Sequence, residues 1–77
     1  MNDSRVPQPV INAAKNLSDI YGENLFFIGT YNGEDVYLFE FPDNVETGFP
    51  FLYFYNVATQ KVTELTGPEA LDVVVLI

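Results

Sequence analysis

The chain has 77 residues, the length of one domain, and 48% of its residues are hydrophobic and 16% aromatic, a composition that argues against disorder. Three basic residues against eleven acidic ones give a net charge of −8, which repels both a nucleic-acid backbone and an anionic membrane surface. The absence of cysteine and histidine excludes disulfides, thiolate metal sites and catalysis by the usual Cys or His groups.

The sequence contains no apolar stretch of the roughly 20 residues that a membrane helix needs. Its first residues, 1–7, lack the apolar core of an export signal. We therefore expect a protein that does not insert into a membrane. It is either cytoplasmic or the mature form of an exported protein whose signal was removed.

A single amphipathic helix is predicted near the start of the chain. Residues 1–8 are polar and are expected to form a flexible tail, and Pro9 is a favourable first-turn residue. Gly22 then ends the helix, which therefore spans residues 9–22. Its apolar residues recur at spacings of three and four and should pack on a sheet. This stripe consists of Val10, Ala13, Ala14, Leu17, Ile20 and Tyr21.

Residues 25–41 carry the strongest structural signal. Two runs of aromatic and β-branched residues flank Asn32-Gly33, a pair typical of a tight hairpin turn. A two-residue turn pairs Phe26 with Phe39, whereas a three-residue turn with a bulge at Gly33 pairs Phe26 with Leu38. Both registers stay open. In either one, both faces of the hairpin are apolar and need cover.

The remaining elements extend the hairpin into an antiparallel meander. Residues 42–50 have the composition of a loop, residues 51–55 an aromatic strand, and residues 62–65 a shorter strand. For residues 68–77 we favour one helical turn and then a final strand over a continuous short helix. The predicted fold is α+β, a single domain with one helix on a four- to five-stranded antiparallel sheet over residues 25–77.

No arrangement of residues predicts an enzyme. Ser18 has only Lys15 as a basic neighbour, and both are expected to be solvated. Glu40 is the one acid inside an aromatic strand, so chemistry by carboxylates alone would have to use it together with a second acid. We predict no catalytic residue and no cofactor.

One loop gathers oxygen ligands that could in principle hold Ca²⁺. Its candidate residues are Asp43, Asn44 and Glu46. Their spacing differs from that of an EF-hand loop, and acidic loops are usually solvated. We therefore predict no metal site.

The strands carry more aromatic residues than one helix can cover from one side. They either over-fill the core or leave a face for contact with a second copy or another protein. Exposed tyrosines could also stack on sugar rings. The candidate binding residues are Tyr31, Tyr37, Glu40, Tyr53 and Tyr55.

Residues 31–37 read Tyr-Asn-Gly-Glu-Asp-Val-Tyr, with a proline-started helix before them and the aromatic strand after them. Over residues 9–67 the chain resembles small bacterial domains with a Tyr-x-Gly-x-x-Val-Tyr hairpin core. This resemblance implies a domain often found behind an export signal or lipoprotein anchor. The helix followed by a meander is also similar to PepSY-type and other inhibitor-like modules. Neither likeness assigns a functional residue.

The expected function is that of a non-enzymatic interaction domain. It would bind a protein partner or itself through the aromatic sheet face or an edge strand. Because the chain is acidic, a different protein that binds it should be basic. The alternative is a carbohydrate-binding accessory module that uses the surface tyrosines.

Overall fold

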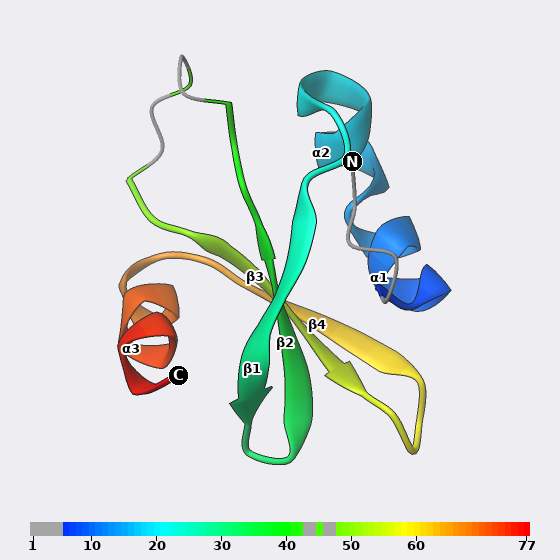
Figure 1. Ribbon diagram of the computed structural model, residues 1–77, viewed down its shortest axis with the longest axis vertical. Coiled ribbons are helices and arrows are strands. Elements are labelled where there is room, and N and C mark those ends of the chain that lie inside the picture. Colours follow the sequence, from blue (N-terminus) through cyan, green and yellow to red (C-terminus); the bar gives the residue numbers. More distant parts are fainter. Residues whose placement is uncertain (1–5, 43–44, 46–47) are drawn as a thin grey trace.

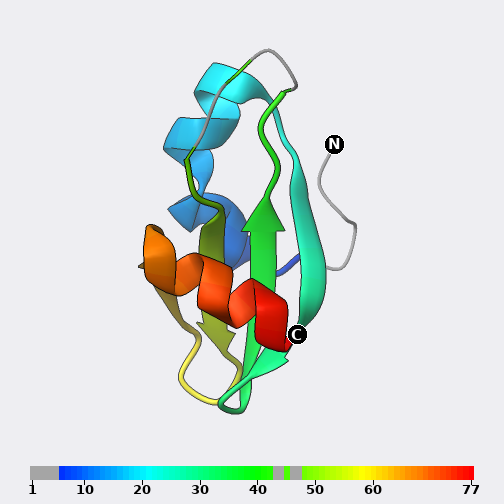
Figure 2. The same cartoon turned by 90° about the vertical axis from the view of Figure 1, so that its left-hand side faces the viewer.

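The computed structural model describes residues 6–42, 45 and 48–77. Within these residues, a four-stranded antiparallel sheet of order β1-β2-β3-β4 lies between helices on its two faces (Figures 1 and 2). The α+β class and the antiparallel sheet are therefore confirmed. The strands are β1 (Leu25–Tyr31), β2 (Glu34–Phe39), β3 (Phe51–Asn56) and β4 (Lys61–Leu65). The helices are α1 (Gln8–Ala13), α2 (Lys15–Tyr21) and α3 (Pro68–Leu76).

The N-terminal region differs from the single helix expected over residues 9–22. The helix is interrupted at Ala14, which has φ −92° and ψ 7° and separates α1 from α2. Val10 and Ala14 are fully buried, whereas Ile20 in α2 is 69% exposed. The predicted stripe is therefore confirmed in part: Leu17 and Tyr21 of α2 pack against the cluster that contains Val10 and Ala14, whereas Ala13 and Ile20 are exposed.

The flexible tail expected over residues 1–8 is also corrected in part. Residues 1–5 lie outside the described residues. Val6 is only 7% exposed and belongs to the core, and α1 already begins at Gln8. An apolar side chain that close to the sheet gains more from burial than the chain loses by being ordered there.

The β1–β2 hairpin contains both of the predicted registers. Asn32 and Gly33 have φ angles of 53° and 79° and form a two-residue turn, so that Tyr31 pairs with Glu34. A bulge between Phe27 and Gly29 then shifts the register by one residue. Beyond it, Phe26 pairs with Leu38, as the three-residue turn would require. The bulge lies within β1 and not at Gly33, which sequence spacing alone could not locate.

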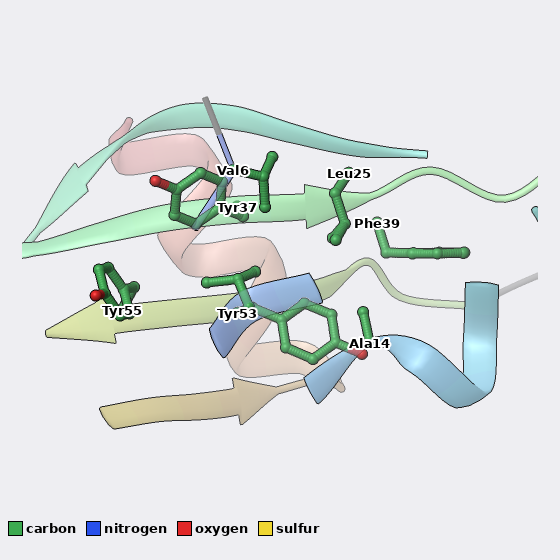
Figure 3. Close-up of a cluster of buried hydrophobic side chains, with 8 residues drawn as sticks. Val6, Ala14, Leu25, Tyr37, Phe39, Tyr53 and Tyr55 are labelled. Atoms are coloured by element: carbon green, nitrogen blue, oxygen red, sulfur yellow. The ribbon is translucent and has the colours of Figure 1, made fainter. Parts of the chain in front are cut away.

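One face of the sheet packs against the N-terminal segment. The ring of Tyr53 on β3 reaches Ala14 at the junction of α1 and α2 (Figure 3). Aromatic edge contacts continue this cluster, and the ring centroids of Phe39 and Phe41 lie 5.1 Å apart. Its buried residues are Val6, Val10, Ala14, Leu25, Tyr37, Phe39, Tyr53 and Tyr55.

The opposite face packs against α3. Ala70 and Val73, three residues apart on the helix, lie in one cluster with Val36 of β2 and Leu52 of β3. Both strands are therefore covered on both faces, as the apolar hairpin requires. Partly buried residues surround this second cluster: Ile28, Tyr31, Leu38, Phe54 and Leu65.

The final strand expected within residues 68–77 is wrong, because these residues form α3. Gly67 has a positive φ of 93°, Pro68 begins the helix, and Glu69 is an acidic residue in its first turn. The β-branched residues that suggested a strand are accommodated because Val73 is buried at helical spacing from Ala70. Here tertiary packing outweighs a small difference in local propensity.

Two valines of α3 test its docking. Val73→Ala should lower the free energy of unfolding by about 1–3 kcal/mol, because it leaves a void against the sheet. Val75→Ala should change it by less than about 0.5 kcal/mol, because Val75 is 82% exposed and alanine favours a helix. Urea unfolding followed by circular dichroism measures both. Equal losses from the two variants would contradict this arrangement.

Position 29 requires glycine, both because of its backbone conformation and because Ile77 lies close to it. Its φ is 148°, and a Cβ atom there would lie 2.5 Å from Cγ2 of Ile77. Gly29→Ala should therefore destabilise the protein by about 1–3 kcal/mol. The control is Gly48→Ala, which meets no atom within 4 Å. We expect it to change the stability by less than about 0.5 kcal/mol in the same unfolding experiment.

Candidate functional site

The four tyrosines predicted to contact a ligand do not form a common surface. Tyr37, Tyr53 and Tyr55 are 4%, 1% and 9% exposed and lie in the cluster beneath α1 (Figure 3). Tyr31 is half-buried in the cluster on the opposite face, where its ring centroid lies 6.0 Å from that of Phe54. The sheet therefore separates Tyr31 from the other three.

Tyr53 is the most deeply buried of these tyrosines. Its hydroxyl is buried, and the pairing of β3 with β4 places the carboxylate of Glu64 opposite it. Burial raises the pKa of Tyr53, and the nearby Glu64 carboxylate raises it further. The neutral phenol therefore serves as a core group and offers no proton at neutral pH.

Glu40 is exposed and follows the end of β2. Its backbone N–H donates a hydrogen bond of 2.9 Å to the carbonyl of Asn24, extending the hairpin pairing beyond the strand. Glu40 thus has a backbone role, and its side chain lies outside the buried clusters.

The candidate calcium residues Asp43, Asn44 and Glu46 lie outside the described residues. Within residues 6–42, 45 and 48–77, no group of three or more Asp or Glu side chains is placed to hold a metal ion.

A groove of about 280 Å³ runs along α1 and α2 and brings Ser18 and Lys15 to the same surface. The Lys15 ammonium group lies 3.2 Å from an oxygen of Asp19, so it has a carboxylate partner. The Ser18 hydroxyl is buried with no hydrogen-bond partner. A nucleophile needs a base within hydrogen-bond reach, and this pairing does not supply one.

The outer face of α3 is a second feature, which sequence reasoning missed. It consists of Leu71, Val74 and Val75, which are 44%, 38% and 82% exposed. Leu76 is also exposed, but it lies on another side of the helix, one turn after Asp72. The spacing of Leu71, Val74 and Val75 would have indicated a second apolar stripe had these residues been assigned to a helix. No helix in the described part of the chain has the length and hydropathy to cross a membrane.

The two edges of the described sheet differ in character. β4 carries Lys61 and Glu64, whereas β1 has no charged residue along its length. Phe26 and Phe27 of β1 are 38% and 39% exposed. Charges protect an edge against pairing with another chain, so β1 is the less protected edge.

Comparison of the chain with protein-family models, curated proteins and solved structures gave no match. The resemblance to exported bacterial domains and to PepSY-type modules therefore stays a prediction.

The buried hydroxyl of Tyr53 predicts the effect of Tyr53→Phe. At neutral pH the free energy of unfolding of the variant should differ from that of the parent by less than about 1 kcal/mol, because the cost of burying the hydroxyl offsets its interaction with the nearby Glu64 carboxylate. The folded state holds the Tyr53 proton more tightly than the ordinary pKa of 10.0 allows. The raised pKa of Tyr53 therefore stabilises the folded state. This stabilisation is fully present below about pH 10 and is lost as the pH rises toward the pKa of Tyr53 in the folded protein.

The parent protein should consequently lose thermal stability above about pH 10, and Tyr53→Phe should reduce that loss. Thermal unfolding followed by circular dichroism between about pH 7 and about pH 11 measures the difference. A loss that is the same in both proteins would show that Tyr53 does not contribute to it.

Proposed function

We propose that the chain is a non-enzymatic interaction domain that binds a protein through the outer face of α3. One observation carries this proposal: α3 is apolar on two sides. Ala70 and Val73 face the sheet, while Leu71, Val74 and Val75 are exposed. A helix that is apolar around most of its surface is usually buried in the state in which it functions.

The exposed side chains of Leu71, Val74 and Val75 are neighbours along one side of the helix. Contiguous apolar surface of this kind marks contact sites more often than single exposed residues do. Burying one such side chain fully contributes about 1.5–3 kcal/mol, so a few of them can offset the entropy that association costs.

The proposed contact surface differs from the one predicted from the sequence. The aromatic sheet face was expected to bind the partner, but α3 occupies the second face of the sheet and α1 the first. The exposed apolar surface is on the outer face of α3 instead. At the C-terminal end of α3, Ile77 lies against Gly29 of β1, so the helix ends beside the less protected edge of the sheet.

The carbohydrate-binding alternative needs tyrosine rings on the surface. Tyr37, Tyr53 and Tyr55 are buried, and a buried ring cannot stack on a sugar. The polar groove on α1 and α2 has no aromatic residue in its lining. These observations support a protein ligand over a sugar.

A double variant of the outer face tests the proposal. Leu71→Gln/Val75→Gln removes two exposed apolar side chains and keeps residues that favour a helix. In affinity capture from the native host, a partner held by the parent should be lost by this variant. The purified partner and the parent should then form a complex of fixed stoichiometry, with binding at least about tenfold weaker for the variant.

The matched control is Ile20→Gln/Val57→Gln, which changes two residues that are 69% and 63% exposed outside α3. It should retain the partner as the parent does. Partners that bind all three proteins equally would overturn the proposal. Near-UV circular dichroism confirms that each variant is folded.

A further inference from the structure

We propose that Asn32 is a modification site, at which the side-chain amide deamidates spontaneously through a cyclic imide formed with the backbone nitrogen of Gly33. The products are aspartate and isoaspartate at position 32. The site is separate from the contact surface on α3 and depends on the turn that joins β1 to β2. Of the two products, isoaspartate would weaken the hairpin.

The reaction needs only these two residues and water. The Gly33 nitrogen gives its proton to hydroxide and attacks Cγ of Asn32, and the amide nitrogen takes a proton from water and leaves as ammonia. Water then opens the imide at either of its carbonyls. Opening at the side-chain carbonyl gives aspartate. Opening at the main-chain carbonyl gives isoaspartate, in which the backbone runs through Cγ.

The turn leaves the attacking nitrogen accessible. Asn32 and Gly33 are both exposed, with φ angles of 53° and 79°. A β-turn is closed by the N–H of its fourth residue, here Glu34, and the carbonyl of its first, Tyr31, so the N–H of Gly33 takes no part. Apart from its chain neighbours, no atom lies within 4 Å of the position that a Cβ of Gly33 would take. The imide can therefore close with a local movement at the tip of the hairpin.

The other asparagines in the described part of the chain lack this combination. Two of them lie in α1 and α2, where closing the ring would disrupt the helix. The Oδ1 atom of Asn56 accepts hydrogen bonds from the N–H groups of Ala58 and Thr59, at 3.0 and 3.1 Å, which fixes its side chain. All of them precede a residue with a side chain that hinders the attack. They are Asn12, Asn16, Asn24 and Asn56, followed by alanine, leucine, leucine and valine.

Isoaspartate would change the turn that sets the register of β1 and β2. It adds a methylene group to the backbone of a two-residue turn, which then no longer matches the twist of the strands. Val36 belongs to the cluster beneath α3 and Tyr37 to the cluster beneath α1, so a slip of one residue would exchange their faces. Aspartate keeps the original backbone and tolerates a positive φ. Isoaspartate is therefore the destabilising product.

Ageing of the folded protein in mildly alkaline buffer tests the site. Each deamidation raises the mass by about 1 Da, which mass spectrometry of the peptides detects. Cleavage after glutamate places Asn24 and Asn32 in one peptide, residues 24–34, in which fragmentation separates them. We expect Asn32 to react at least about tenfold faster than each of the other described asparagines. An equal rate at any of them, or an unreacted Asn32 in the folded chain, would overturn the proposal.

Two variants check the assignment on the whole chain. Asn32→Gly keeps a residue that accepts a positive φ and removes the reacting amide, so the gain in mass should slow at least about fivefold. The matched control, Asn16→Gln, removes an exposed asparagine of α2 and should leave the rate within about twofold of the parent. Equal gain in Asn32→Gly and the parent would contradict the assignment.

Thermal unfolding separates the effects of the two products. Anion exchange isolates the aged protein, which carries one more negative charge, and enzymatic methylation measures its isoaspartate content. Asn32→Asp supplies the reference for the aspartate product. The isoaspartate fraction should unfold at least about 4 °C below Asn32→Asp. Coincident unfolding, or an aged protein that contains no isoaspartate, would overturn the proposed effect on the hairpin.

Discussion

The structure depends on covering a sheet that is apolar on both faces. β2 and β3 place Phe39 and Tyr53 on one face and Val36 and Leu52 on the other, and all four side chains are almost completely buried. A sheet of this kind cannot expose either side to water without a large cost. The positions of α1 before the sheet and α3 after it follow from that requirement, and so does the burial of residues as close to the start as Val6.

Covering both faces also decides where the remaining apolar residues can go. α3 uses Ala70 and Val73 against the sheet, so its other apolar residues must face outward. The bulge in β1 contributes in a different way, because a shift of one residue brings Leu25 and Phe27 opposite Phe39 and Tyr37 on the first face. The exposed apolar face of α3 is thus a by-product of how a short chain rich in apolar residues completes its core.

The sequence predicted the features that local chemistry controls. Asn32-Gly33 indicated the turn because both residues tolerate the positive φ that the turn requires. The bulge in β1 could not be found this way, because it depends on which side chains meet across strands. The final strand was wrong because Val73, Val74 and Val75 favour a strand locally, while the uncovered face of the sheet favours a helix there. For the same reason the burial of Tyr37, Tyr53 and Tyr55 could not be read from their alternation alone.

The attachment of α3 gives the molecule a weak point with a thermodynamic consequence. Of the side chains in α3, Ala70 and Val73 are the buried ones, and both are small. A helix held in this way opens locally at a lower free energy than the strands beneath it, and opening would admit water to Val36 and Leu52. Whatever binds the closed helix must oppose that opening by mass action. Amide hydrogen exchange in β2 and β3 would therefore slow when the outside of α3 is occupied, although the ligand never touches those strands.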